Sequence, residues 1–236
     1  MKKVFTIAVL LMCTVVLGQK APTITHAKTT EGFIPKGWKQ IAIAKGDLNK
    51  DGTDDVVLVI EDTDKKNFIP NENMGSKTLN VNPRQLLILF SDKATGFYNL
   101  AIAQETFIPE ANSEEDPCLA DPLLEDGGIA IKKGTLVIDL HNWVSCGSYW
   151  AGHITYVFRY QEGSFMLIGY DTSEYNRATG EQNKTSINFN TKKKSTTTGD
   201  NILEDVPAKP KTVWEYIKIT KLIRLEDLNR TTEISY

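Results

Sequence analysis

The chain has little of what marks a nucleic-acid-binding or membrane-spanning protein. Lys and Arg number 27 against 30 Asp and Glu, so no surplus of positive charge is available for a phosphate backbone. After residue 17 no apolar run approaches the ~20 residues that a spanning helix needs. Only three cysteines and three histidines are present, and their spacing matches no zinc motif. The sequence therefore predicts no nucleic-acid partner, no zinc and no transmembrane segment in the mature chain.

The N-terminus has the parts of a Sec signal peptide. Residues 1–3 carry two lysines, residues 4–17 are mostly apolar, and Gly18 closes the stretch. This apolar run is too short for a comfortable membrane span, so we expect cleavage after Gly18 and a secreted or periplasmic protein. Lipoprotein processing at Cys13 is the alternative, but Met12 stands where such processing needs a small residue.

Removal of the signal peptide, residues 1–18, would change the charge and the cysteine count. It takes away two lysines and Cys13, and leaves 218 residues with 25 Lys and Arg against 30 Asp and Glu. The remaining Cys118 and Cys146 are an even number in an exported chain, which favours a disulfide over two free thiols. We expect residues 19–35 to be a flexible lead-in and residues 36–236 to form one mainly-β domain.

Short strand signals separated by turns fill most of this domain. Val56–Ile60 and Leu86–Phe90 are apolar at every position, which is typical of strands buried on both faces. Glycine-bearing connections predict antiparallel hairpins at residues 91–96, 132–134 and 161–164. The predicted fold class is mainly β, an antiparallel meander of hairpins around one core, with a propeller blade as one option for their arrangement.

Polar stretches interrupt this pattern. Residues 62–84 and 105–127 contain prolines, and we expect them to be long insertions between strands. Towards the C-terminus the chain is again polar, with one short strand expected at Ser186–Asn190 and a basic, threonine-rich turn over residues 191–200. The last strand is expected at Ile217–Leu225.

The densest motif is GDLNKDGTDD, residues 46–55, which an apolar strand follows at once. Oxygen-bearing side chains stand at alternate positions, at Asp47, Asn49 and Asp51, before a glycine and then Asp55. Calcium needs six or more oxygen ligands, and alternate residues of a tight loop can supply them. An EF-hand does not fit, because the flanking segments are strands and the twelfth position of the loop is apolar. The remaining alternative is a turn rich in Asp and Asn that binds no metal.

Residues 46–59 resemble the FG-GAP repeat, the blade motif of integrin-type β-propellers, in a single copy. In that family the loop joins two strands of a blade and binds calcium. The resemblance implies Ca²⁺ ligands from the side chains of Asp47, Asn49, Asp51 and Asp55 and from the backbone carbonyl of Thr53. Because no pair of helices is present that could switch on binding, we expect the ion to be structural.

Residues 141–153 form a second dense region, with two tryptophans, a tyrosine and two histidines around a glycine-bearing loop. One interpretation makes Trp143, Tyr149 and Trp150 a carbohydrate-binding surface on which sugar rings stack. The other is a disulfide-anchored loop whose aromatic side chains cover the end of the sheet. Neither serine of the loop lies in a GxSxG elbow, and the histidines lack a ligand spacing, so we expect neither serine catalysis nor a transition-metal site.

Two functions remain after these exclusions. The main hypothesis is an exported, non-catalytic, calcium-stabilised β-domain that acts as a binding or structural module of the bacterial envelope or exterior. Its partner would be a glycan or another envelope component. The alternative is a secreted hydrolase acting on glycan or peptide, because residues 110–126 carry seven Asp and Glu side chains that could supply two opposed carboxylates.

Overall fold

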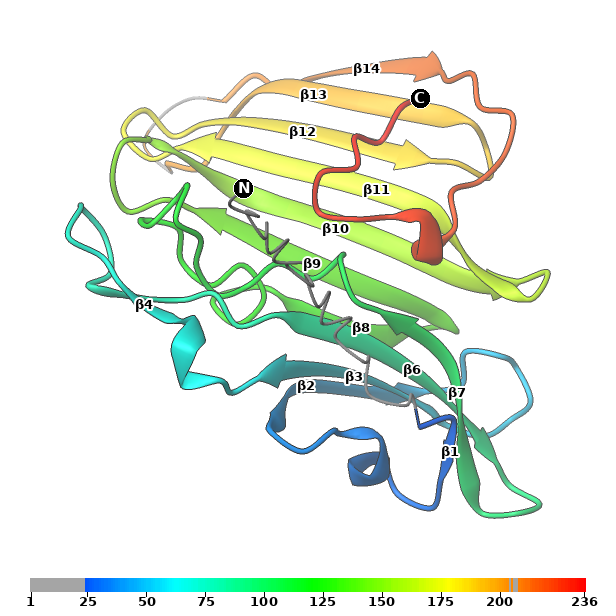
Figure 1. Ribbon diagram of the computed structural model, residues 1–236. Helices are drawn as coiled ribbons and strands as arrows, with labels where there is room; N and C mark the ends of the chain where they lie inside the picture. The colour runs from blue at the N-terminus through cyan, green and yellow to red at the C-terminus, as the bar shows by residue number, and fades with distance from the viewer. Residues whose placement is uncertain (1–23, 204, 206–207) are drawn as a thin grey trace, which may run out of the picture.

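The computed structural model describes residues 24–203, 205 and 208–236, so the predicted signal peptide lies outside the described residues (Figure 1). Within this range the chain forms fourteen strands and three short 3₁₀ helices, and no α-helix. Every strand pair is antiparallel. The predicted mainly-β, antiparallel class is confirmed. None of the described helices has the length and apolarity to cross a bilayer.

The first sheet has five strands in the order β1-β7-β6-β3-β2. Its members are β1 (His26–Ala27), β2 (Trp38–Gly46), β3 (Asp55–Asp62), β6 (Arg84–Asp92) and β7 (Phe97–Gln104). The two segments predicted as strands buried on both faces are the middles of β3 and β6, which lie side by side inside the sheet. The insertion between them carries a small hairpin of β4 (Phe68–Pro70) and β5 (Thr78–Asn80).

The second sheet has seven strands, and each is the neighbour of the next in sequence. This meander consists of β8 (Gly128–Lys132), β9 (Thr135–Trp143), β10 (Trp150–Gln161), β11 (Ser164–Asn176), β12 (Glu181–Asn188), β13 (Lys193–Asn201) and β14 (Lys211–Tyr216). The 3₁₀ helices are η1 (Thr30–Phe33), η2 (Lys65–Asn67) and η3 (Leu225–Asp227). The hairpins predicted at residues 132–134 and 161–164 connect β8 to β9 and β10 to β11.

The C-terminal expectations need correction. Residues 191–200, expected as a turn, mostly belong to β13, which pairs with both β12 and β14. β13 contains no apolar residue, so its sequence lacks the alternation of apolar and polar side chains that predicts a strand. Its threonines nevertheless suit an extended backbone. Ile217–Leu225, expected as the last strand, contains no named strand; it contributes buried Ile217 and Leu225 to the core.

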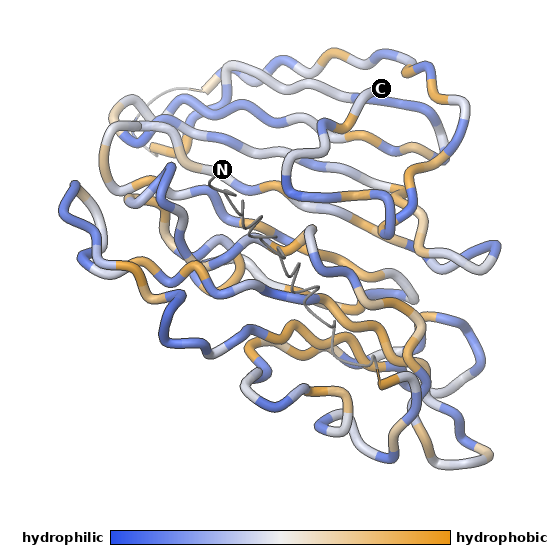
Figure 2. Tube along the Cα trace, in the orientation of Figure 1, coloured by the Kyte–Doolittle hydropathy of each residue, from blue (hydrophilic) through white to orange (hydrophobic). Residues whose placement is uncertain are grey.

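The core lies on both faces of the five-stranded sheet. On one face Val57, Val59 and Ile88 join a cluster with Leu136 and Phe158 of the seven-stranded sheet. On the other face a separate cluster forms under the N-terminal segment, where Phe33 is buried against the sheet. The tube in Figure 2 is accordingly most hydrophobic along β3 and β6. Within the expected flexible lead-in, His26–Ala27 form β1 and Thr30–Phe33 form η1.

The edges of the two sheets meet at β2 and β8. A Cβ atom on Gly46, at the end of β2, would lie 2.7 Å from the Cγ2 atom of Ile131 on β8. The absence of a side chain at Gly46 therefore allows this close approach. The C-terminal segment then crosses in front of β10 and β11 (Figure 1), where the Leu167 N–H donates to the Ile223 carbonyl over 2.8 Å.

Candidate functional site

The predicted calcium loop connects β2 to β3, so it lies between two paired strands. Two residues of the loop have left-handed backbone, Lys50 with φ 66° and Gly52 with φ 82°. Glycine adopts this conformation at no steric cost, so Gly52 permits the tight turn. The loop also touches the turn between β8 and β9, because a Cβ atom on Gly134 would lie 3.4 Å from the Asp47 carbonyl oxygen. The loop is therefore placed where the two sheets meet.

The loop carboxylates turn inward onto its own backbone. The Asp47 carboxylate accepts the N–H groups of Lys50 at 2.6 Å and Gly52 at 3.0 Å. The Asn49 side-chain oxygen accepts the Asp51 N–H, and Asp51 accepts the Thr53 N–H at 2.8 Å. The Asn49 amide nitrogen in turn donates to the Asp51 carboxylate at 3.0 Å, and this bond, followed by the one from the Thr53 N–H, lowers the pKa of the Asp51 carboxyl. Three oxygen-bearing side chains at alternate positions, those of Asp47, Asn49 and Asp51, thus accept backbone N–H groups of one turn.

Asp55 is fully buried at the end of this loop. Its carboxylate accepts three backbone N–H groups, from Leu48 at 2.9 Å, Asn49 at 3.2 Å and Ser91 at 3.1 Å. Burial nevertheless raises the pKa of the Asp55 carboxyl, because desolvation outweighs these bonds. The ionised group therefore carries a desolvation cost that a neighbouring cation would offset.

The donor chemistry of the loop fits calcium, although its carboxylates are not gathered into a cluster. Among the described residues no three His, Cys, Asp or Glu side chains stand together as a metal site. The expected ligands from the loop are all oxygens: the carboxylates of Asp47, Asp51 and Asp55, the Asn49 amide oxygen and the Thr53 carbonyl. A carboxylate oxygen that accepts one N–H keeps a second lone pair for a cation. An all-oxygen set suits Ca²⁺ and excludes the softer metals that need sulfur or imidazole.

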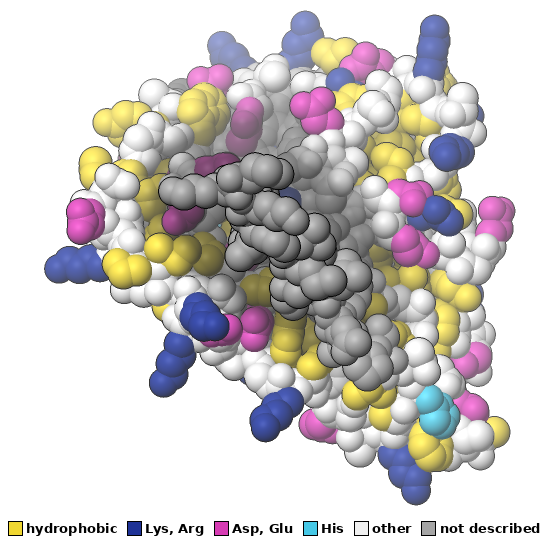
Figure 3. All heavy atoms as spheres, in the orientation of Figure 1, with side chains coloured by type: hydrophobic (Ala, Val, Ile, Leu, Met, Phe, Trp, Pro, Cys, Tyr) yellow, Lys and Arg dark blue, Asp and Glu magenta, His cyan; other side chains and the backbone are white. Residues whose placement is uncertain are grey.

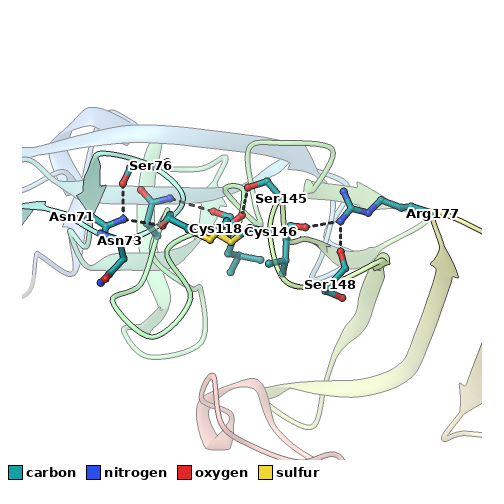
Figure 4. The surroundings of a disulfide bond; sticks show 12 residues. Asn71, Asn73, Ser76, Cys118, Ser145, Cys146, Ser148 and Arg177 are labelled. Carbon is teal, nitrogen blue, oxygen red and sulfur yellow. Dashed lines mark hydrogen bonds between the residues drawn. A yellow bond between two sulfur atoms is a disulfide. The ribbon is translucent and has the colours of Figure 1, made fainter.

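The predicted disulfide between Cys118 and Cys146 is confirmed, with the two Cα atoms 5.6 Å apart (Figure 4). It joins the insertion before β8 to the loop between β9 and β10. Ser145 reinforces this link, because both its N–H and its hydroxyl donate to the Cys118 carbonyl, at 2.9 and 3.1 Å. The β4–β5 hairpin packs against the same segment, where the Ser76 N–H donates to the Pro117 carbonyl.

Arg177, at the end of β11, holds the same loop from the other side. Its Nη2 group donates to the Val144 carbonyl at 2.8 Å and to the Ser148 carbonyl. Its guanidinium carbon lies 4.4 Å from the ring centroid of Trp143. Among the described residues its Nε group is buried without a hydrogen-bond partner. Arg177 therefore fixes the loop through carbonyls and an aromatic face.

The three aromatic side chains proposed as a platform have different environments. Trp143 is partly buried beneath Arg177, whereas Tyr149 is 67 % and Trp150 is 37 % exposed. A pocket of 540 Å³ opens beside Tyr149, lined by Ser145, Gly147, Ser148, Tyr149, Arg177 and Ala178. Its described lining offers hydroxyl groups, one aromatic ring and one guanidinium, and no carboxylate. Such a lining suits a polar ligand with flat apolar faces.

The histidines and serines of this region already have structural partners. His153 Nδ1 lies 2.8 Å from an Asp139 carboxylate oxygen, and the His141 ring stacks on His153 with centroids 4.6 Å apart. The Ser148 hydroxyl accepts the Trp150 N–H, whereas the Ser145 hydroxyl donates to the Cys118 carbonyl. These contacts orient the loop and the strand ends.

A buried ionic network, not predicted from the sequence, links Glu61 of β3, Arg84 of β6 and Asp121 of the acidic insertion. Arg84 is fully buried; its Nε donates to Glu61 at 2.8 Å, and its Nη1 donates to Asp121 at 2.8 Å. Burial would raise the pKa of Glu61, but bonds from Lys39 and Arg84 outweigh it and lower that pKa. Burial would likewise raise the pKa of Asp121, but the hydrogen bond and the charge of Arg84 outweigh burial and lower that pKa. The sequence holds one indication of this network: Arg84 stands just before the apolar segment Leu86–Phe90. An arginine that is buried with such a segment needs an acidic partner.

Part of the acidic insertion therefore has a structural role in holding the fold together. Arg84 also donates to the Pro109 carbonyl at 3.2 Å, so it connects β6 to two points of residues 105–127, at Pro109 and at Asp121. Glu110, the first acid of the stretch, pairs with Arg230 near the C-terminus. Two of the acids that the hydrolase hypothesis could use are therefore bound to arginines. On the described part of the face in Figure 3, acidic and basic side chains are interspersed.

Comparisons with protein-family models, curated proteins and solved structures found no match to this chain.

Proposed function

We propose that this chain is an exported, non-catalytic binding module of the bacterial envelope or exterior. Its ligand is a glycan, bound in the pocket beside Tyr149. The observation that carries this proposal is the combination of exposed aromatic side chains and a polar pocket on one anchored loop. Tyr149 and Trp150 remain exposed although the loop around them is held by the disulfide and by Arg177.

The chemistry of the pocket matches the chemistry of a sugar. Aromatic rings stack on the apolar face of a sugar ring, and Tyr149 presents such a ring at the pocket. The hydroxyls and backbone groups around Ser145 and Ser148 are suited to bonding sugar hydroxyls. A loop fixed at both ends loses little conformational entropy on binding, which favours affinity for a small, hydrated ligand.

We further propose that calcium stabilises this module from the junction of its two sheets. The side chains of Asp47, Asn49, Asp51 and Asp55 and the Thr53 carbonyl would hold the ion. When bound, it supplies positive charge to a loop with four carboxylates, of which Asp55 is buried. The loop contacts both the β8–β9 turn and Ser91 of β6, so ordering it supports both sheets. The loop proposed to bind the ligand connects β9 to β10 of the seven-stranded sheet, so a rigid junction between the sheets helps to hold that loop in place.

The test is a glycan array that includes bacterial envelope polysaccharides, followed by calorimetric titration of the best ligand. Tyr149→Ala should bind about tenfold more weakly, because one aromatic contact is removed from the pocket. Tyr236→Ala is the matched control, since Tyr236 is also exposed but lies at the C-terminus. No array ligand, or equal binding by both variants and the wild type, would reject the proposed site.

A further inference from the structure

The last strand of the second sheet, β14, has an open edge. It is the outermost strand in Figure 1, and all six of its residues are exposed. They include three large apolar side chains, with Val213 52 %, Trp214 67 % and Tyr216 79 % exposed. Native proteins usually protect such an edge with a proline, a bulge, charged side chains or a covering segment, and the two charges of β14, Lys211 and Glu215, are of opposite sign. Within Lys211–Tyr216 there is no proline, and the register with β13 contains no shift.

The other long outer edges of the two main sheets are occupied. The edge of β8 lies against β2, where Ile131 meets Gly46. The outer edge of β7 is paired with β1. Among the described strands of these sheets, β14 is therefore the long strand whose free edge is left open to a partner.

The register shows which backbone groups face outward. The Ile217 N–H donates to the Lys192 carbonyl at 3.0 Å, and these residues continue the register in which Tyr216 faces Lys193. Bonded pairs alternate with non-bonded pairs along antiparallel strands. The bonded positions therefore fall on the odd-numbered residues of β14. Thr212, Trp214 and Tyr216 then direct their backbone N–H and C=O groups away from β13.

We propose that two copies of this chain pair antiparallel through β14, which joins their seven-stranded sheets into one of fourteen strands. A two-fold axis beside Val213 places Thr212 opposite Trp214 of the second copy, so that their outward backbone groups bond. The same register places Lys211 opposite Glu215 of the second copy, and symmetry repeats this charge pair. The two Trp214 side chains become diagonal neighbours on one face, within reach of each other.

The charges favour a second copy over another occupant. Moving the register by one bonded step in either direction would set Lys211 against Val213 or Ile217, and would lose both charge pairs. Glu215 has Lys194 of its own chain 3.1 Å away, yet its side chain is 56 % exposed and open to a second cation. The strand is therefore self-complementary in one register, as a two-fold symmetric interface requires.

The test is the molecular mass of the purified protein, measured by sedimentation equilibrium over a concentration series. The wild type should be a dimer. Lys211→Glu should weaken association about tenfold, because two symmetry-related pairs become like-charged. The double variant Lys211→Glu with Glu215→Lys should restore association, because the pairs are reformed with reversed charges. Lys218→Glu is the matched control, since it makes the same charge change on an exposed residue just beyond β14.

A backbone variant tests the strand pairing separately. Thr212→Pro removes an outward N–H group while leaving the bonds to β13 in place, so it should favour the monomer. Circular dichroism of each variant should match the wild type, which shows that the fold is kept. A monomeric wild type would overturn the proposal. So would a dimer that resists both Lys211→Glu and Thr212→Pro, because its interface would lie elsewhere.

Discussion

Substitution of Arg84 by methionine should be one of the most destabilising single changes in this chain. Methionine keeps much of the apolar stem but removes the charge and all the donors of the guanidinium. Glu61 and Asp121 would then be left near one another with one cation fewer, and both are at least partly buried. Removing one partner from a buried ion pair costs about 3–5 kcal/mol, because the other charge stays desolvated.

We expect the lower part of that range, about 3 kcal/mol of unfolding free energy. Glu61 keeps its bond to Lys39, and Asp121 keeps the N–H groups of Leu123 and Leu124 at 3.0 and 3.1 Å. Urea unfolding followed by far-ultraviolet circular dichroism measures the loss. Lys39→Met is the control: Lys39 binds the same Glu61 but is largely exposed, and exposed pairs contribute about 0–1 kcal/mol.

The unfolding free energy lost in Arg84→Met should also depend on pH. The pKa values of Glu61 and Asp121 are lower in the folded protein than the ordinary carboxyl values of about 4, so their ionised forms stabilise the fold. That stabilisation is complete above the unfolded-state values and is lost as the pH falls through the folded-state values. The difference between wild type and Arg84→Met should therefore narrow below about pH 4. A loss under about 1 kcal/mol at neutral pH, or one independent of pH, would refute the account of this network.

Two further predictions concern the calcium loop and the disulfide. Calcium at a hundredfold excess over its dissociation constant should add about 2.7 kcal/mol of stability, measured as a rise in melting temperature over chelator-treated protein. Asp51→Ala should abolish that rise; an unchanged wild-type melting temperature in chelator would contradict calcium binding. Replacement of both Cys118 and Cys146 by serine should cost about 3.5 kcal/mol in urea unfolding, from the polymer model for a separation of 28 residues. Equal unfolding midpoints for wild type with and without reductant would contradict a stabilising bridge.

The sequence could predict two kinds of strand: those that are apolar and buried on both faces, and those joined by turns whose residues favour a positive φ. β3 and β6 are apolar on both faces, and burial on both faces is what the structure has. The β8–β9 and β10–β11 turns use a lysine or glutamate followed by glycine, all with positive φ, as at Lys133 and Gly134. β13 could not be predicted, because its side chains alternate in neither size nor polarity. The prediction of a strand at Ile217–Leu225 was wrong, because an irregular buried segment can contain the same apolar residues as a strand.

The candidate site could be predicted only where its parts are close in sequence. The disulfide could be predicted from the number of cysteines together with the export that the N-terminus predicts, and the aromatic loop from its composition. Arg177 could not be assigned, because it reaches the loop from a strand end 29 residues beyond Ser148. Likewise, nothing in the sequence pairs Arg84 with Asp121, which is 37 residues away. Such contacts depend on strand order, which local patterns do not encode.

Hydrogen–deuterium exchange, with and without the best ligand from the glycan array, tests the proposed function most directly. We predict slower exchange in residues 145–150 and around Arg177 when ligand is bound, since these segments line the pocket. Exchange in β14, which contributes no residue to the pocket lining, should not change. Protection confined to other segments, or no protection under saturating ligand, would contradict the claim that this loop is the binding site.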